Sequence, residues 1–311
     1  MNIKRVMTEI GIAILVAGSP AISAPKTNTS ALTQTVITVR PPLSDNRPDG
    51  LEAADLTVLR RNIPVPVIRL ERLSGTLADM QLFVLLDESS RSSSLGVQLP
   101  ELKTFLKSLP TTTQVAIGYM RNGTFGLVQP FTADHEKSAH VLRLPTAIPG
   151  ENGSPYFALS DLAKHWPAKQ SSNRRAVLML TDGVDRYYDG ADPDDPYVNA
   201  AIHDALKENV MVYSIYLRGA GLYGRSAWGT NVAQSRLEQV SEETGGYAYS
   251  MGFTDPVTIT PFLKDFQNRL NNQYRVTVEE LKSNEKGVQP VKLRSELRGV
   301  KIEGPTRIYV R

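Results

Sequence analysis

An apolar run that ends in an acidic residue is the feature that most constrains how this chain folds. The run extends from Leu82 to Leu86 and is followed at once by Asp87. A short continuous apolar run bounded by polar turn residues is typical of a strand buried on both faces of a parallel sheet. Ligands of such sheets bind beyond the carboxyl ends of the strands, which is where we expect Asp87. A cluster of hydroxyl side chains comes next, namely Ser89, Ser90, Ser92, Ser93 and Ser94.

The oxygen atoms of Asp87 and these serines allow two interpretations. A carboxylate beside several hydroxyl groups suits a hard divalent cation such as Mg²⁺, Mn²⁺ or Ca²⁺. Asp87 and one serine also suit the N-terminal cap of the helix that follows. Taken alone, the stretch favours the cap.

Strand and helix patterns alternate from residue 81 onward. Apolar runs predict strands at residues 81–87, 115–120, 124–131, 176–180, 210–217 and 246–250. Helical spacing of apolar residues predicts helices at residues 95–109, 134–144, 156–166, 197–208, 232–244 and 260–274. This alternation implies an α/β fold with a doubly wound, mostly parallel sheet. The dipeptide Asn122–Gly123 between two apolar runs predicts a hairpin, which adds one antiparallel edge strand.

The predicted α/β domain, residues 77–275, lies between two small segments of β character. The N-terminal β segment covers residues 36–76 and the C-terminal β segment covers residues 276–311. Both contain short alternating runs separated by turn residues, which is typical of strands with one buried face. We expect the two flanking segments to form one accessory sheet.

The N-terminus has the layout of an export signal. Lys4 and Arg5 precede an apolar core at residues 10–18, and small residues follow. This order predicts a secretory signal peptide at residues 1–23, followed by a flexible leader at residues 24–35. The core is too short for a transmembrane helix, which needs about 20 apolar residues. We therefore expect an exported protein, periplasmic or secreted, that does not span a membrane after signal cleavage.

Composition narrows the functional classes. The net charge is +3 and no basic block occurs, so the chain lacks the electrostatic footprint of a nucleic-acid-binding protein. Cysteine is absent, which excludes disulfides, thiolate nucleophiles and cysteine-ligated metal sites. The sequence also lacks a Gly-x-Ser-x-Gly elbow, a Walker loop and a dinucleotide fingerprint.

Three segments that follow one another in the chain carry a family resemblance. They are LLDESSR around Asp87, NGSPYFALSDLA around Ser154, and LMLTDG around Asp182. In this order they resemble the loops of the metal-ion-dependent adhesion site of the von Willebrand factor A family. That site uses an Asp-x-Ser-x-Ser loop, a Thr where this chain has Ser154, and an Asp. The later segments VYSIYLR, LEQVSEETGGYAY and FLKDFQNRLNNQYRVTVEE resemble a bacterial exported subfamily, so the resemblance runs from about residue 36 to the C-terminus.

The resemblance implies both a site and a kind of function. Members of this family hold a divalent cation on top of a doubly wound sheet, and the ion leaves one coordination position for an acidic side chain of a partner protein. Here the implied ligands of Mg²⁺ or another divalent cation are Asp87, Ser89, Ser154 and Asp182. The implied function is protein–protein binding and adhesion, and we do not expect an enzyme.

Arg91 departs from the family pattern. It stands where the second Ser of Asp-x-Ser-x-Ser is expected, and an arginine offers donors only, so it cannot ligate a metal. If it points inward, its charge pairs with Asp87 and Asp182 and substitutes for the ion. Two other arrangements stay open: the shifted register Glu88-x-Ser90-x-Ser92, or a bulged loop in which Ser90 or Ser92 fills the place.

Two further hypotheses come from other functional classes. The first is a structural or scaffold module whose ion site is inactive. The second is a serine hydrolase that uses Ser154, because the members of a catalytic triad can come from distant parts of a chain.

The segment 220–229 also carries Tyr223 and Trp228 between glycines, which suits either a binding surface or a loop that folds its own aromatic side chains inward.

Overall fold

The computed structural model describes residues 32–40, 50–89, 92–147, 153–168, 170–188, 190, 194–219, 226–279 and 286–310. The predicted signal peptide, residues 1–23, and Arg91 lie outside the described residues. So do Ser90 and most of the segment 220–229. Within the described part of the chain, no helix is long and apolar enough to cross a bilayer.

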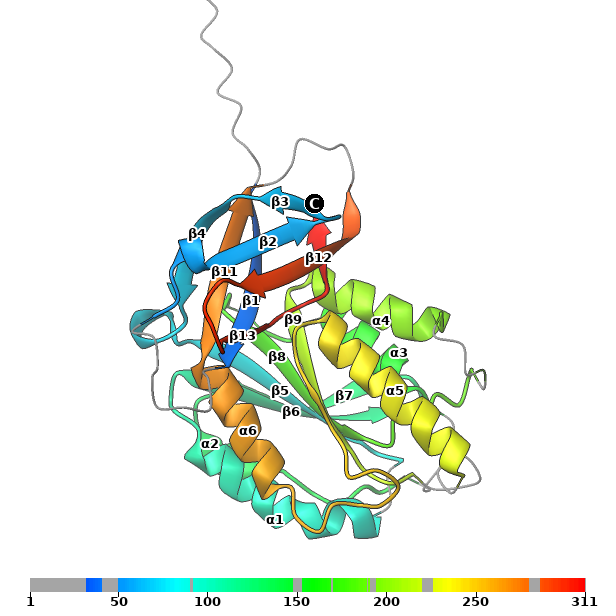
Figure 1. The fold of residues 1–311 in the computed structure, drawn as a ribbon. Helices are drawn as coiled ribbons and strands as arrows, with labels where there is room; N and C mark the ends of the chain where they lie inside the picture. Colours follow the sequence, from blue (N-terminus) through cyan, green and yellow to red (C-terminus); the bar gives the residue numbers. More distant parts are fainter. Residues whose placement is uncertain are drawn as a thin grey trace, which may run out of the picture.

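A six-stranded sheet forms the centre of the α/β domain (Figure 1). Its order is β10-β9-β8-β5-β6-β7, and all neighbours pair in parallel except β6 and β7. The doubly wound α/β fold predicted from the sequence is thereby confirmed. The strands are β5 (Met80–Asp87), β6 (Thr113–Arg121), β7 (Thr124–Thr132), β8 (Arg175–Thr181), β9 (Val210–Tyr216) and β10 (Ala248–Tyr249).

β5 lies in the middle of this sheet because its sequence is apolar on both faces. All eight of its residues are buried, down to Asp87 at its carboxyl end. Counted from β5, the strand order is 3-2-1-4-5-6, so the chain changes direction across the sheet between β5 and β8. In doubly wound sheets ligands bind at this switch point, beyond the carboxyl ends of the strands. We call this end of the domain the top face.

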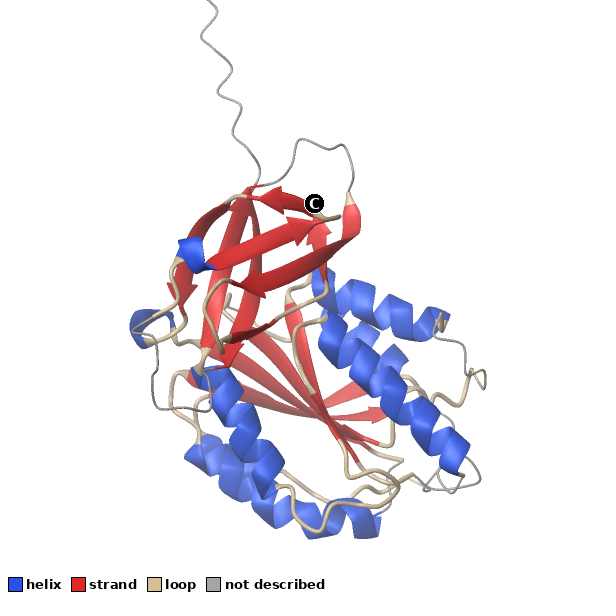
Figure 2. Cartoon of the chain, in the orientation of Figure 1, coloured by secondary structure: helices blue, strands red, loops and turns tan. Residues whose placement is uncertain are grey.

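Helices cover both faces of the sheet, as Figure 2 shows. One face packs against α1 and α6 through Leu102 and Phe266, and the other packs against α3, α4 and α5 through Leu159, Ile202 and Leu237. The helices are α1 (Ser92–Ser108), α2 (His135–His140), α3 (Pro155–Lys164), α4 (Pro196–Lys207), α5 (Ala227–Glu243) and α6 (Thr260–Asn271).

Helix boundaries differ from the sequence prediction by up to five residues. α5 begins at Ala227, five residues before the predicted start, because the Ser226 side chain accepts a hydrogen bond from the amide of Gly229 and caps the helix. α2 ends at His140 instead of near residue 144. α6 ends at Asn271, because Gln273 already belongs to the next strand.

The flanking segments form two four-stranded sheets, where a single accessory sheet was expected. One has the order β13-β1-β11-β4 and the other β14-β12-β2-β3. They share one apolar core, and two sheets are needed because each has only one apolar face to bury. The strands are β1 (Leu32–Arg40), β2 (Leu56–Arg60), β3 (Ile63–Val65), β4 (Val67–Arg72), β11 (Gln273–Glu279), β12 (Gly287–Ser295), β13 (Lys301–Glu303) and β14 (Arg307–Val310).

We call these two sheets the sandwich. β1 begins at Leu32, so the last four residues of the predicted flexible leader are strand residues. They are ordered because β1 pairs with β11 over seven positions, from Leu32 opposite Glu279 to Thr38 opposite Gln273. Two short 3₁₀ helices also occur, Ala53–Asp55 before β2 and Gly75–Leu77 between β4 and β5.

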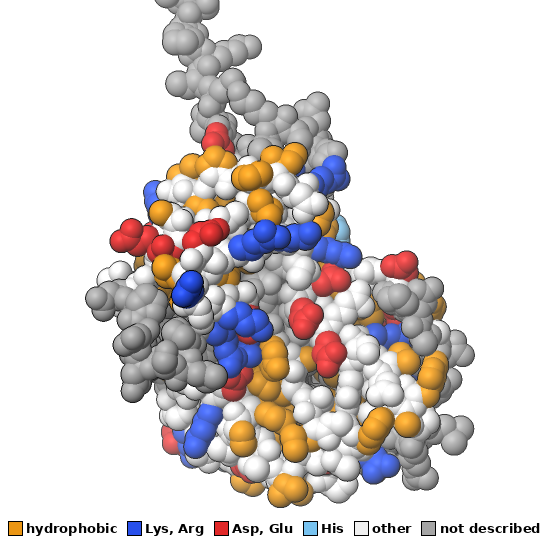
Figure 3. All heavy atoms as spheres, in the orientation of Figure 1, with side chains coloured by type: hydrophobic (Ala, Val, Ile, Leu, Met, Phe, Trp, Pro, Cys, Tyr) orange, Lys and Arg blue, Asp and Glu red, His pale blue; other side chains and the backbone are white. Residues whose placement is uncertain are grey.

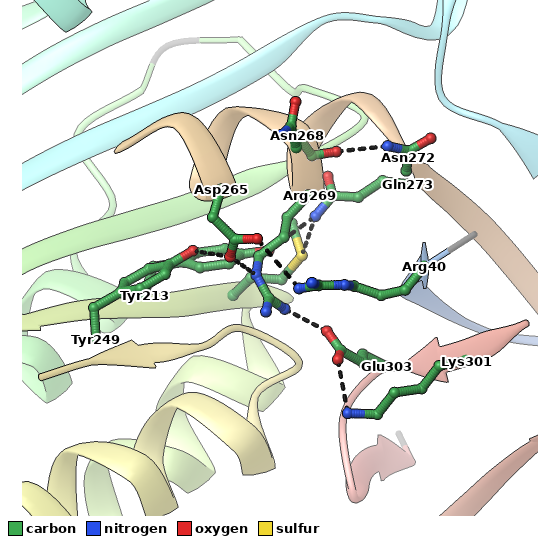
Figure 4. Close-up of polar contacts among 11 residues, drawn as sticks. Arg40, Tyr213, Tyr249, Asp265, Asn268, Arg269, Asn272, Gln273, Lys301 and Glu303 are labelled. Atoms are coloured by element: carbon green, nitrogen blue, oxygen red, sulfur yellow. Dashed lines mark hydrogen bonds and ion pairs between the residues drawn. The ribbon is translucent and has the colours of Figure 1, made fainter. Parts of the chain in front are cut away.

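A polar network joins the sandwich to the α/β domain (Figure 4). At its centre is Arg269 of α6, whose side chain is only 4% exposed. Its Nε donates to Asp265 at 2.6 Å, and its Nη1 donates to Glu303 of β13. Arg40 of β1 contacts Asp265 at 3.3 Å, and Lys301 contacts Glu303 at 2.9 Å. This junction therefore links a helix of one domain to two strands of the other.

Candidate functional site at the top face

Side chains from three loops meet at the top face around a small pocket. Asp87 and Ser89 come from the end of β5, Ser154 precedes α3, and Arg186 follows β8. These four residues line a pocket of about 20 Å³, which is room for about one water molecule. The structure thus brings together three of the four site residues predicted from the sequence.

Asp87 is buried and bound by donors from its own loop and from β8. Its Oδ1 accepts hydrogen bonds from the backbone amide of Ser89 at 2.8 Å and from the Ser89 hydroxyl at 2.7 Å. Its Oδ2 accepts a hydrogen bond from the Thr181 hydroxyl at 2.7 Å. The backbone-to-carboxylate bond fixes the turn after β5, as a capping Asp does. Thr181 was not predicted as a site residue, yet it ties β8 to β5.

Asp182, the fourth predicted residue, faces a guanidinium group. Its Oδ2 lies 2.8 Å from Nη2 of Arg186, and the two side chains are 1% and 9% exposed. Its Oδ1 accepts a hydrogen bond from the amide of Val184 at 3.0 Å. Gly219 packs against the same carboxylate so closely that an added Cβ would lie 2.6 Å from Oδ2. Only glycine fits this position without displacing Asp182.

The Ser154 hydroxyl makes two hydrogen bonds, one to the start of α3 and one to the loop after β8. Its hydroxyl donates to Asp185 Oδ2 at 2.9 Å and accepts from the Phe157 amide at 3.4 Å, which makes Ser154 the N-cap of α3. Asp185 also accepts from the amide of Tyr187 at 2.8 Å. The hydroxyl therefore connects the loop before α3 with the loop after β8.

Two buried carboxyl groups of the site have raised pKa values. Burial, together with the charge of Asp182, raises the pKa of Asp87 to about 6, although hydrogen bonds from Thr181 and Ser89 oppose the rise. Burial also raises the pKa of Asp185. Burial lowers the pKa of the Arg186 guanidinium, but Asp182, Asp87 and Asp185 outweigh it and leave this pKa raised. The Arg186 guanidinium thus faces the charges of three carboxylates.

The donor chemistry of the site suits a hard cation, but protein donors already engage the oxygen atoms that would bind one. Two carboxylates and nearby hydroxyl groups are ligands that Mg²⁺ accepts. However, all four carboxylate oxygen atoms of Asp87 and Asp182 already accept hydrogen bonds from the protein. Across the described ranges, no three Asp, Glu or His side chains come close enough together to hold one ion. As arranged here, these residues do not fit a metal ion.

Comparisons with known proteins match this chain to solved structures alone. No protein-family model matches the chain, and no curated protein matches it. Among solved structures, an aerotolerance-related membrane protein from Bacteroides fragilis is 14% identical, with a TM-score of 0.44, covering 62% of this chain and 98% of its own. The conserved hypothetical protein BatB from Bacteroides thetaiotaomicron is 12% identical, with a TM-score of 0.38 and coverages of 61% and 96%. The VWA domain of SpRpn10 is 10% identical, with a TM-score of 0.41 and coverages of 61% and 97%.

The strand order and the position of the three loops decide the fold. The sheet is doubly wound, and the Asp87, Ser154 and Asp182 loops meet at its top face, as the sequence resemblance implies. The α/β domain has a von Willebrand A-like fold. Residues 73–272 form this domain, and the sandwich is attached at the opposite end from the site (Figure 1).

The shifted register Glu88-x-Ser90-x-Ser92 is wrong for this von Willebrand A-like domain. Glu88 accepts hydrogen bonds from Arg143 Nη1 at 2.9 Å and Nη2 at 3.2 Å, and from the Thr146 amide at 2.8 Å. Its carboxylate is therefore held by the segment after α2 and not by the site. The strand continues directly into Asp87, so a shift by one residue would turn every side chain over.

The sequence interpretation missed Arg186 as well as Thr181. A charge that substitutes for the ion was considered at Arg91, whereas the structure places Arg186 against Asp182. The signal in the sequence was the segment DGVDR, in which an arginine follows Asp182 by four residues. Because residues 183–188 form no helix, that spacing did not indicate where the side chain points.

Proposed function

We propose that this protein is an exported binding module that holds a protein partner on the top face of its von Willebrand A-like domain. The sandwich serves as the base that connects this domain to the N-terminal leader. The proposal concerns binding and involves no bond-making step. The observation that carries it is the combination, at one end of the domain, of an ordered polar site with exposed apolar side chains.

The apolar side chains lie on elements that begin or end at the top face. Val97 lies near the start of α1 and Trp228 near the start of α5, and they are 61% and 51% exposed. The segment between β10 and α6 adds Met251, Phe253 and Val257, which are 58%, 52% and 90% exposed. Exposed apolar groups with a polar rim mark interaction surfaces, and aromatic residues dominate binding energy at such surfaces.

The segment that carries Met251, Phe253 and Val257 is held in place on the top face. Asp255 accepts hydrogen bonds from the Ser94 hydroxyl at 2.8 Å and from the Arg218 amide at 2.6 Å. These bonds tie the segment to α1 and to the end of β9. Figure 3 shows apolar side chains at the end of the molecule opposite the sandwich. A surface that is already ordered loses little entropy when it binds a partner.

A divalent cation that captures an acidic side chain of the partner remains a prediction. It would use Asp87, Ser89, Ser154 and Asp182, the ligands that the family resemblance implies. The existing hydrogen bonds of these residues favour partner binding without an ion. The alternative of a metal-free scaffold shares this site and differs only in having no partner at the top face.

The contacts of Ser154 give no support to the serine hydrolase alternative. Its hydroxyl donates to Asp185, and no histidine accepts from it among the contacts of the described residues. The rings of His135, His165 and His203 contact Thr113, Asp161 and Asp204, which lie elsewhere in the fold. A serine without a base is not an activated nucleophile.

Site-specific photo-crosslinking in cells that produce the protein tests the proposal. A photoreactive amino acid at Phe253 probes the top face, and the same group at Ile68 probes the sandwich. The two positions form a matched pair because both side chains are 52% exposed. We expect a defined crosslinked partner from Phe253 that is missing from Ile68.

Two results would contradict this proposal. The first is an identical set of products from Phe253 and Ile68. The second is the persistence of the Phe253 product when the neighbouring Val257 is changed to Asp, since a charge there has to weaken an apolar contact.

A further inference from the structure

The position of Arg186 suggests a role that goes beyond partner binding. Its guanidinium bonds Asp182 at 2.8 Å and the Val184 carbonyl at 3.3 Å, while its own backbone amide donates to the Gly153 carbonyl at 3.1 Å. Through these contacts one residue connects the loop after β8 with the loop before α3. Those are the two loops that carry Asp182 and Ser154.

Arg186 also stands between the pocket and Asp182. Among the described residues that line the pocket are Asp87, Ser89, Ser154 and Arg186, but Asp182 is not one of them. The remaining space of about 20 Å³ suits one water molecule. Mg²⁺ usually keeps several of its water ligands, so a hydrated ion cannot reach Asp182 while the guanidinium is in place.

The electrostatics of the site favour a permanent cation at this position. An arginine stays charged in proteins and forms strong, directional bonds with carboxylates. Removing such a partner from a buried carboxylate leaves an uncompensated charge, which is strongly unfavourable. Asp182 is 1% exposed, so the guanidinium and not water compensates its charge.

We propose that Arg186 is the resident cation of this site and takes the place of a divalent metal ion. The wild-type protein then holds its three top-face loops together without added metal. Substitution of Arg186 frees Asp182 and opens the space that a hydrated ion needs. The inference does not depend on the identity of a partner, because its test uses Mn²⁺ alone.

The chain contains a matched control for this test. Arg236 and Asp195 form a second buried pair, with Nη2 and Oδ2 2.8 Å apart and side chains 7% and 0% exposed. Arg236→Ala therefore frees a buried carboxylate just as Arg186→Ala does. Asp195 caps α4 through bonds to Tyr197 and Val198 and lies outside the serine-containing pocket.

The experiment measures Mn²⁺ binding to the full chain by calorimetry and by the loss of the free Mn²⁺ paramagnetic resonance signal. We expect at least tenfold tighter binding by Arg186→Ala than by the wild type, with a higher melting temperature in Mn²⁺ for that variant alone. Arg186→Lys keeps the charge and Arg236→Ala lacks the site, so neither gains affinity. The double variant Asp182→Asn with Arg186→Ala loses the gain.

Arg186→Gln provides a second route if Arg186→Ala does not fold, because it keeps hydrogen-bonding atoms and removes the charge. The inference is overturned if the wild type binds Mn²⁺ as tightly as the neutral variants do. It is equally overturned if no folded neutral variant gains affinity, or if Arg236→Ala gains as much as Arg186→Ala. Crosslinking from Phe253 is a separate readout, so the proposed function can fail while this inference stands.

Discussion

The junction and the site lie at opposite ends of the six-stranded sheet, and each contains a buried arginine. Their charges are balanced differently. At the junction, Arg269, Arg40 and Lys301 face only two carboxylates, Asp265 and Glu303. At the top face, the guanidinium of Arg186 faces three carboxylates, namely Asp87, Asp182 and Asp185. Arg236, which pairs with Asp195, also acts on Asp185.

The pKa values of the carboxyl groups shift in opposite directions in the two regions. At the junction, burial raises the pKa of Asp265, but hydrogen bonds from Arg269 and Tyr249 and the charges of Arg269 and Arg40 outweigh burial and lower it overall. The pKa of Glu303 is lowered in the same way. At the top face, burial raises the pKa of Asp87 to about 6. The junction therefore stabilises the fold, whereas the site keeps an excess of negative charge at the cost of stability.

The largest expected effect is at the junction. Arg269→Met removes a guanidinium that is 4% exposed and leaves Asp265 and Glu303 without their shared partner. Breaking a buried ion pair by removing one member costs roughly 3 to 5 kcal/mol, so we expect a loss of that size in the free energy of unfolding. Urea denaturation followed by tryptophan fluorescence measures it.

Arg40→Met is the matched control for this substitution. Arg40 bonds the same Asp265 but is 41% exposed, and exposed pairs contribute about 1 kcal/mol or less. Equal losses for Arg40→Met and Arg269→Met would mean that burial does not distinguish the two contacts. The contrast between a stabilising junction and a charged site would then fail.

The next effect is a pH dependence at Asp87. A carboxyl group whose pKa is raised on folding contributes stability below its unfolded pKa of 3.8, and this contribution is lost as pH rises through about 6. Each pKa unit corresponds to about 1.4 kcal/mol. The free energy of unfolding of Asp87→Asn, relative to that of the wild type, should therefore rise by on the order of 3 kcal/mol from acidic to mildly alkaline pH. Urea denaturation at a series of pH values measures the difference.

Asp265→Asn should show the opposite trend. Because the pKa of Asp265 is lowered, its contribution to stability is present above the unfolded pKa and is lost as pH falls. The variant is therefore least stable, relative to the wild type, at neutral pH and above. The same sign of pH dependence for both variants would contradict the charge comparison.

The smallest expected effect concerns Ser154. It caps α3 as Ser226 caps α5, and loss of a cap costs about 1 kcal/mol. Ser154 also donates to Asp185, so we expect Ser154→Ala to cost about 1 to 2 kcal/mol and Ser226→Ala about 1 kcal/mol in thermal or urea unfolding. A smaller loss for Ser154→Ala than for Ser226→Ala would show that the bond to Asp185 does not stabilise the site.

The fold of the α/β domain could be predicted because its signals are local. The apolar run before Asp87 and the turn at Asn122–Gly123 specify a buried strand and a hairpin from neighbouring residues alone, and both are confirmed. The division of the flanks into two sheets depends on pairs such as Leu32 opposite Glu279 and Val58 opposite Leu293. Such pairs join residues more than 200 positions apart, and no local pattern specifies them.

The candidate site could be predicted only in part. Asp87, Ser89 and Ser154 follow strands or precede a helix in the order of a known motif, and the structure places them around one pocket. Whether they bind a metal stays a prediction. Arg186 was missed because the direction of a long side chain on an irregular loop depends on the carboxylates that surround it.

The attachment of the α/β domain also has a mechanical consequence. The chain leaves the sandwich at Leu73 and returns at Gln273, and the amide of Leu73 donates to the carbonyl of Gln273 at 2.9 Å. β4 and β11, which flank these two points, pair with each other. Tension applied to the two ends of the described chain therefore loads the sandwich first. The inserted domain, with its candidate site, bears that tension only after β4 and β11 have separated.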